Sequence, residues 1–258
     1  TLEEAENKLA NGVPIKKVFN EVRRDGDLVL VSLLGRWNIL GEGNTFVCDC
    51  WYDYVWDFSE GFAVVSDKTK GWNLINREGK ELCERWYDDV YGFSEGFARV
   101  KDDNKGYNFI NREGKELCDR WYNYVWNFSE GFAAVLDGNN GYNFINREGK
   151  EICDRWYDKF LDFKKGFAKV FDETKGWNFI NRDGNEISDR WYDEVWDFRD
   201  GFAVVIYKGK YYLLMEDGVL CDAETGKPIE DGPKQIAESL INRLVREVLR
   251  ENRKRYYL

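Results

Sequence analysis

A 35-residue repeat constrains this chain more than any other feature of its sequence. A unit of that length with short strands cannot bury its own faces, whereas stacked neighbours can, and large aromatic side chains then contribute the most buried area. We therefore expect an array of like units, each packed on the next. The interval is kept by a tryptophan in each of five copies: Trp51, Trp86, Trp121, Trp156 and Trp191.

The first and last copies depart from the pattern. Residues 18–22 stand for Trp-Tyr-Asp-x-Val in a degenerate first copy, and residues 210–212 replace the Gly-Trp-Asn step in the last. Terminal copies meet solvent or a cap rather than another repeat, so such drift is expected. We count six copies, in residues 18–225.

Each copy is expected to form short β-strands. In the copy that begins at Trp86, residues 96–100 and 106–111 alternate in the way of strands and are separated by a polar turn. Gly114 lies in the next tight turn, at the position that needs a positive φ. Residues 116–118 are predicted to start a third strand, and the Tyr-Asp-x-Val segment adds a fourth extended piece.

The repeated residues resemble a known family. Tyr-Asp-x-Val-x-x-Phe-Ser-Glu-Gly-Phe-Ala-x-Val, then Trp-Asn-Phe-Ile-Asn-x-x-Gly-Lys-Glu, is similar to the WG-repeat (KWG) family of bacterial β-repeats over residues 18–221. The resemblance implies a binding or scaffolding module of bacterial or phage origin, with no shared catalytic residues. One departure is that asparagine stands where the family has glycine after the tryptophan: Asn73, Asn108, Asn143 and Asn178. Glycine precedes the aromatic residue instead: Gly71, Gly106, Gly141 and Gly176.

Two all-β architectures fit these repeats. One is an open, solenoid-like array of tandem β-repeats with helical ends, and the other is a closed six-bladed β-propeller. A propeller blade usually has four strands and at least about 40 residues, so 35 is short for a blade. No split copy that could close a ring is visible either. The sequence therefore favours the open array.

The two ends are predicted to be helical. Residues 2–10 form a short helix that ends at residues 11–12, within an N-terminal cap at 1–17. The C-terminal segment, residues 226–258, is expected to contain an amphipathic helix. It caps the last repeat, docks a protein partner or a second copy, or lies on a membrane surface. Its candidate partner-binding residues are an apolar stripe and a basic end: Ile236, Leu240, Leu244, Val248, Arg253, Lys254 and Arg255.

The composition argues against several functions. Histidine is absent, which removes the usual general base and the commonest zinc ligand, so we expect no enzyme, metal or cofactor. The net charge of −10 argues against nucleic-acid binding, and no apolar run is long enough for a transmembrane helix. Cysteines recur at one repeat position (48, 83, 118, 153 and 221), with Cys50 beside the first, and we interpret them as buried thiols. Free thiols and the lack of a visible signal peptide favour a cytoplasmic or virion-associated protein.

The repeated polar and aromatic residues have a structural and a functional interpretation. The aspartates after Trp-Tyr, such as Asp88, are expected to cap backbone groups in turns. Each Arg-Trp pair places Arg where it can stack on a ring of a neighbouring copy. Tyr87, Tyr122 and Trp126 are candidate glycan platforms, with core packing as the alternative. The predicted function is a noncatalytic protein-interaction or assembly module, and the alternative is a carbohydrate-binding repeat protein.

Any specific partner must use side chains that differ between the copies. Two repeat positions vary most. One holds Tyr54, Asp89, Tyr124, Lys159 and Glu194, and the other holds Trp56, Tyr91, Trp126, Leu161 and Trp196. If the Trp-Tyr rings are buried, an interface is expected at these positions or on the C-terminal helix.

Overall fold

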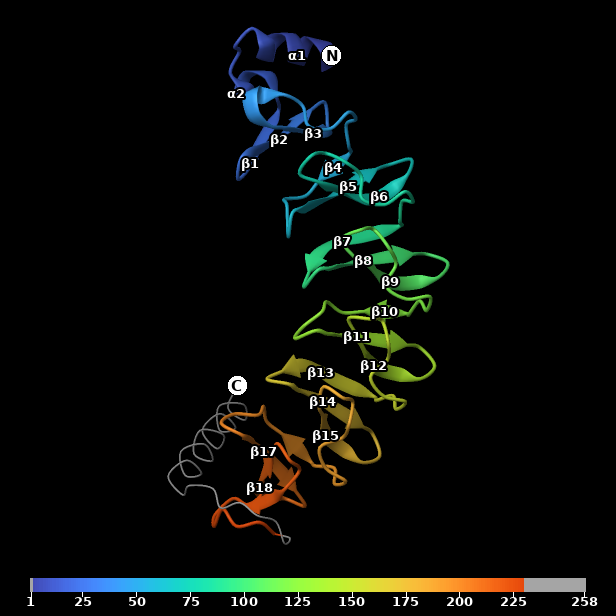
Figure 1. Cartoon of the computed structure of the whole chain (residues 1–258), viewed down its shortest axis with the longest axis vertical. Coiled ribbons are helices and arrows are strands. Elements are labelled where there is room, and N and C mark those ends of the chain that lie inside the picture. The colour runs from blue at the N-terminus through green and yellow to red at the C-terminus, as the bar shows by residue number, and fades with distance from the viewer. Residues whose placement is uncertain (1, 230–258) are drawn as a thin grey trace. The chain divides into compact units, whose positions relative to one another are not determined.

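The computed structural model describes residues 2–229 and divides the chain into two compact units. Unit 1 ends at Phe128 and unit 2 begins at Ser129, and each unit is described by itself. Antiparallel β-strands dominate both units (Figure 1). None of the helices among the described residues is long and apolar enough to cross a membrane.

Unit 1 begins with two helices and continues with three antiparallel sheets of three strands each. The helices are α1 (Leu2–Ala10) and α2 (Ile15–Val18), and a short 3-10 turn, η1 (Glu42–Asn44), follows the first sheet. The sheets contain β1 (Glu21–Asp25), β2 (Leu28–Leu33) and β3 (Arg36–Leu40), then β4 (Tyr54–Val55), β5 (Phe62–Asp67) and β6 (Gly71–Asn76), then β7 (Asp89–Ser94), β8 (Phe97–Asp102) and β9 (Gly106–Ile110). The unit ends with β10 (Tyr124–Val125).

Unit 2 repeats the same hairpins. Its strands are β11 (Phe132–Asp137) and β12 (Gly141–Asn146), then β13 (Lys159–Lys164), β14 (Phe167–Asp172) and β15 (Gly176–Ile180), then β16 (Glu194–Val195), β17 (Phe202–Tyr207), β18 (Lys210–Met215) and β19 (Leu220–Asp222). The last four strands pair in chain order as one sheet.

The predicted N-terminal helix is present as α1. Ala5 is buried and packs with Val31 and Leu40 of the first sheet, so the helix covers that sheet as a cap would. The helix ends where the sequence indicated, because Gly12 takes a φ of 75°.

Stacking of one repeat on the next forms the core of unit 1. Val64 of β5 and Leu74 of β6 join a buried cluster with Val90, Val100 and Ile110 of the following sheet. A fully buried aliphatic side chain of this kind contributes about 1.5 to 3 kcal/mol. The expectation that each repeat buries a face of the next is therefore confirmed within unit 1.

Phenylalanine pairs join neighbouring copies. The ring of Phe62 lies 4.7 Å from that of Phe93, and the ring of Phe97 stacks on that of Phe128 at 4.5 Å. In unit 2 the same pairing joins Phe167 to Phe198 at 4.1 Å. Offset stacking adds to the area that such rings bury.

Two glycine positions require glycine. Gly114 has a φ of 76°, as its turn predicted, and a Cβ there would lie 2.6 Å from the carbonyl oxygen of Leu82. Gly106 has a φ of 103°, and its Cβ would lie 2.2 Å from the carbonyl oxygen of Tyr122. This close approach explains why glycine precedes the aromatic residue in these repeats.

The predicted third strand at residues 116–118 is wrong. Glu116 forms only an isolated bridge to Ile110, and the Leu117 amide donates to the Phe109 carbonyl at 2.8 Å. The segment is held by single contacts rather than by a ladder of backbone hydrogen bonds. In one of them the side-chain amide of Asn108 donates to the Cys118 carbonyl at 2.7 Å.

The first strand differs between alternate copies, which the sequence analysis did not predict. β4, β10 and β16 have two residues each, whereas β7 and β13 have six and contain a register shift. The short strands are followed by tryptophan, as in Trp56, whereas the bulged strand β7 has Tyr91-Gly92 at this point. A bulge admits an extra residue, and glycine suits it.

The repeats therefore form the expected all-β fold, as a succession of small antiparallel sheets. Among residues 2–229, the sheets of each unit follow one another in chain order and no sheet closes into a barrel (Figure 1). The choice between an open array and a six-bladed propeller involves both units and stays a prediction.

Candidate functional site

A buried asparagine fixes the framework of each repeat. Asn73 is fully buried, and its side-chain amide donates to the Cys83 carbonyl at 2.8 Å. Its Oδ1 accepts from the Leu74 amide at 2.8 Å and from the Cys83 amide at 3.2 Å. In other copies an asparagine side-chain amide likewise donates to the carbonyl ten residues further on: Asn38, Asn108, Asn143 and Asn178. The departure from the family's glycine thus has a structural role.

The Arg-Trp-Tyr segments lie at the junctions between copies. The guanidinium of Arg85 lies 4.6 Å from the Tyr87 ring and 5.8 Å from the Trp121 ring of the next copy, and the Lys105 ammonium lies 5.3 Å from Trp121. In unit 2, Arg155 makes the corresponding contact with Trp191 at 4.6 Å. The predicted stacking of Arg on a neighbouring ring is confirmed. The protein's own Arg and Lys side chains therefore lie over the faces of these rings.

The repeated aspartates cap turns, as predicted. The Asp53 carboxylate accepts from the Lys68 amide and that of Asp88 from the Asp103 amide, both at 2.7 Å. In unit 2 Asp158 accepts from the Glu173 amide at 2.7 Å. These carboxylates have a backbone partner and a fixed orientation.

The cysteines are all free; Cys48, Cys83 and Cys221 are buried as predicted, whereas Cys118 and Cys153 are only half-buried. Burial raises the pKa of the Cys48 thiol to about 12 and that of Cys83 to about 11. Cys50 corrects the prediction, because it is exposed. Within residues 2–229, no group of three or more potential ligands among Cys, Asp and Glu could hold a metal ion.

Two of the three candidate glycan platforms are wrong. Tyr87 and Tyr122 are each only 3% exposed, so neither ring offers a face to a ligand. Both tyrosines pair with the strand before them, through bridges to Trp72 and Tyr107. Trp126 is half-buried and lies beside Tyr124, with ring centroids 4.7 Å apart.

The variable positions, in contrast, lie at an open edge of the sheets. Tyr54 and Trp56 are 41% and 40% exposed. The Trp56 ring lies 6.4 Å from Tyr54 and 6.3 Å from Trp72, edge-to-face in both cases. We call the half-exposed rings at these positions and their cross-strand neighbours in unit 1 the aromatic edge: Tyr54, Trp56, Trp72, Tyr91, Tyr107, Tyr124 and Trp126.

Arg99 orders the second half of the aromatic edge. Its guanidinium lies 4.2 Å from the Tyr91 ring and 5.9 Å from Tyr124. It also donates to the Tyr124 hydroxyl at 3.2 Å and to the Val125 carbonyl at 3.1 Å. Sequence reasoning missed Arg99. The signal was available, because this position also differs between copies: it holds Val64, Ala134, Lys169 and Val204 elsewhere.

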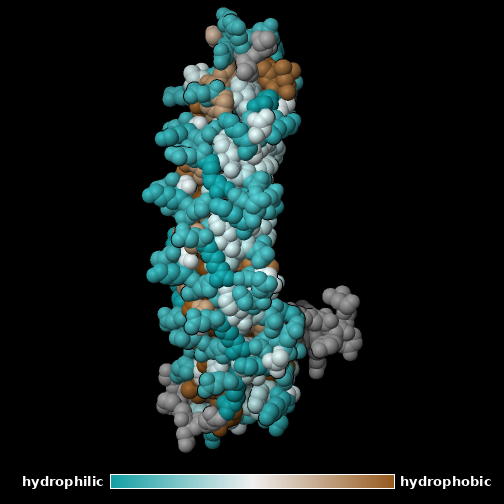
Figure 2. Space-filling model, turned by 90° about the vertical axis from the view of Figure 1, so that its right-hand side faces the viewer, coloured by the Kyte–Doolittle hydropathy of each residue, from teal (hydrophilic) through white to brown (hydrophobic). Residues whose placement is uncertain are grey.

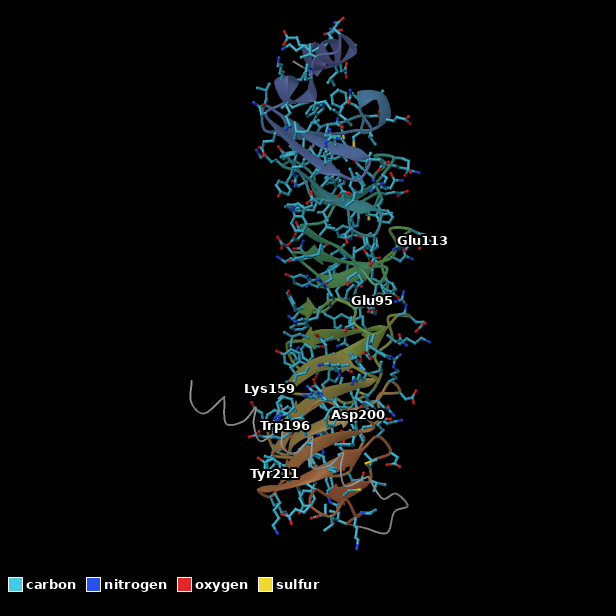
Figure 3. The ribbon with its side chains drawn as sticks, turned by 90° about the vertical axis from the view of Figure 1, so that its left-hand side faces the viewer. Glu95, Glu113, Lys159, Trp196, Asp200 and Tyr211 are labelled. Atoms are coloured by element: carbon cyan, nitrogen blue, oxygen red, sulfur yellow. The ribbon has the colours of Figure 1, made fainter. Side chains whose placement is uncertain are left out.

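Unit 2 carries different side chains at the same positions. Trp196 and Tyr211 have ring centroids 6.4 Å apart, and Figure 3 shows them on the same side of the unit as Lys159. Beside them, Asp197 accepts from Lys164 at 2.7 Å and pairs with Lys169 at 2.5 Å. These positions therefore carry different side chains in most copies on one framework, although the pair of Tyr54 and Trp56 recurs as Tyr124 and Trp126.

The C-terminal candidates cannot be placed. The stripe that includes Leu244 and the basic end that includes Arg253 lie outside the described residues 2–229. Their proposed roles as a cap or an interface stay predictions.

Comparisons with known proteins give a family and several distant structural likenesses. The family profile of the WG containing repeat matches residues 44–70, 72–105, 109–140 and 177–211. No curated protein matches the chain. The computationally designed Ika8 protein is 14% identical, with 84% of this chain and 74% of that chain covered and a TM-score of 0.37. BamB from Moraxella catarrhalis is 12% identical, with 77% and 67% covered and a TM-score of 0.36. Hsv2 from Kluyveromyces lactis is 9% identical, with 76% and 72% covered and a TM-score of 0.38.

Proposed function

This chain belongs to the family of proteins built from WG containing repeats, and on that basis we propose that it is a noncatalytic protein-interaction module that binds through its aromatic edge. The framework positions are already occupied by internal partners, as Tyr87 and Arg85 illustrate. A partner must therefore contact side chains that these internal contacts leave exposed.

One observation carries the proposal: half-exposed Trp, Tyr and Arg side chains gather at the positions where the copies differ. Tyr54 and Trp56 are about two-fifths exposed, and Arg99 lies between two tyrosines. Trp, Tyr and Arg are the residues enriched in the energetic centres of protein interfaces. Their mutual contacts hold the rings in place before binding, which lowers the entropy that association costs.

A carbohydrate is the second candidate ligand. It is supported by the edge-to-face arrangement of Tyr54 and Trp56, which leaves part of each ring accessible. The proposal for a protein partner has the additional support of Arg99, because arginine is enriched together with Trp and Tyr at the energetic centres of protein interfaces.

The test is affinity capture from extracts of the native host with three forms of the protein. Trp56→Ser and Tyr91→Ser each remove a ring of the aromatic edge, whereas Glu113→Ser changes an exposed turn residue outside the edge (Figure 3). We expect both edge variants to lose a protein partner that the Glu113 variant retains. A single truncation at an interface centre costs about 2 kcal/mol or more, which is roughly a thirtyfold loss of affinity.

Equal capture by all three forms would contradict the proposal. The carbohydrate would be favoured instead if the unmodified protein bound an oligosaccharide on a glycan array, and if the Trp56 variant lost this binding while it still captured the protein partner. Circular dichroism of each variant shows whether the repeats remain folded.

A further inference from the structure

A leucine protrudes from the first hairpin of unit 1 where the fold has no need of it. β2 and β3 pair up to Leu33 and Arg36, so Leu34 and Gly35 form a two-residue turn with φ values of 53° and 76°. Leu34 is 81% exposed. Left-handed backbone is uncommon for leucine and normally favours Gly, Asn or Asp.

Other copies show that this turn tolerates polar residues. The hairpin of β17 and β18 has the same two-residue turn, with φ values of 51° and 74°, and places Lys208 where Leu34 stands. The longer turns of the internal copies are also polar, as at Lys68 and Thr69. The turn itself therefore does not require an apolar side chain at this position, and leucine adopts the left-handed conformation there at a cost.

A hollow lies directly beside this leucine. Its volume is about 530 Å³, and its lining includes Leu33, Leu34 and Arg36 of the hairpin together with Cys50, Trp51 and Trp86. Lys70 contributes its ammonium, 5.0 Å from the Trp86 ring. Figure 2 shows hydrophobic side chains gathered near the N-terminal end of unit 1, on a face that is otherwise mostly teal and white. The hollow has room for a leucine side chain and walls suited to one.

We propose that the occupant of this hollow is Leu34 of a second copy of this chain, in a two-fold symmetric pair. A two-fold contact requires one patch that is complementary to itself, and a protruding side chain next to a matching hollow meets that requirement. The charges agree, because the lining contains acidic Asp49 and Asp67 as well as basic Arg36 and Lys70. Exposed Lys70 of one copy can then face exposed Asp49 of the other, without like-charge repulsion.

The association is expected to be weak. Stable interfaces bury at least about 1,200 Å² in total, so a pair held only by its two hairpin turns and two hollows is expected to be a weak one. The pair therefore forms at high protein concentration and dissociates on dilution. This assembly does not depend on the aromatic edge, so it stands or falls separately from the proposed function.

Sedimentation velocity over a wide range of concentration tests the proposal. The full chain should move from monomer toward dimer as its concentration rises. Leu34→Asn removes the apolar side chain and suits the left-handed turn, and Leu34→Lys copies the turn at Lys208, so both should fold at least as well. We expect each to weaken the association at least about tenfold. Trp56→Ser, on the aromatic edge, should associate like the unmodified protein.

The exposed thiol at the hollow supplies a second measurement. Labelling of Cys50 by a maleimide should slow as the concentration of the unmodified protein rises, and should not do so for Leu34→Asn. A full chain that remains monomeric at every concentration would overturn the proposal and leave the hollow to a different partner. A Leu34→Asn variant that dimerises as strongly as the unmodified protein would overturn it as well.

Discussion

Replacing Asn73 with alanine should destabilise unit 1 far more than its size suggests. The side chain is fully buried and makes three hydrogen bonds, to the Leu74 amide and to both the amide and the carbonyl of Cys83. Alanine leaves these three backbone groups buried without that partner. Each unsatisfied buried group costs about 1 to 3 kcal/mol, so a loss of about 3 kcal/mol or more is expected even if a water enters the space.

Urea denaturation followed by tryptophan fluorescence measures this loss. Asn104→Ala is the matched control, because Asn104 is exposed in a turn and only its backbone amide makes a hydrogen bond, to Asp102. The control should change stability by less than about 0.5 kcal/mol. Hydrogen exchange should also quicken at Cys83 in the Asn73 variant, because its amide loses its acceptor. A loss below about 1 kcal/mol would refute the claim that the Asn73 side chain holds the segment around Cys83 in place.

Three further changes test other parts of the fold. Gly106→Ala should lower the free energy of unfolding by several kcal/mol in urea denaturation, because its Cβ would lie 2.2 Å from a carbonyl oxygen. Gly61→Ala is the control and should cost only about 1 to 2 kcal/mol, because Gly61 has a φ of 90° but no atom within 4 Å of its Cβ. Phe97→Ala should cost about 3 to 5 kcal/mol, because Phe97 is 8% exposed and stacks on Phe128; a loss below about 1 kcal/mol would contradict its place in the core. Burial raises the pKa of Asp197, but hydrogen bonds from two lysines outweigh burial and lower this pKa to about 2. The stabilisation is therefore present above the ordinary Asp pKa of about 3.9 and is lost as the pH falls toward 2, and Asp197→Asn should remove that part of the acid sensitivity of the urea midpoint.

The sequence predicted the fold well because its signals are repeated. Glycine at a fixed interval, as at Gly114, and small residues between β-formers can be recognised in one copy and checked in the others. What it could not predict depends on the contacts of individual side chains. The strand expected at residues 116–118 is absent, and instead the Asn108 amide donates to the Cys118 carbonyl, a contact that spacing alone does not reveal.

The candidate site was only partly predictable for the same reason. Tyr87 and Trp56 are both aromatic residues of the repeat, yet one is 3% and the other 40% exposed, because the neighbouring copy covers only the first. Variation between copies was the better guide, since it identified Tyr54 and Trp56 as possible contacts. The position of Arg99 varies as well, but the role of Arg99 depends on two tyrosines that the fold brings to it.

Hydroxyl-radical footprinting of the protein with its captured partner tests the central claim most directly. The account predicts that oxidation of Tyr54, Trp56 and Tyr91 falls severalfold in the complex, because a partner covers the aromatic edge. Oxidation of Trp121, which lies at a repeat junction between Arg85 and Lys105, should stay unchanged. Unaltered oxidation of the three edge residues, with protection elsewhere on the chain, would contradict the claim that the protein binds through this edge.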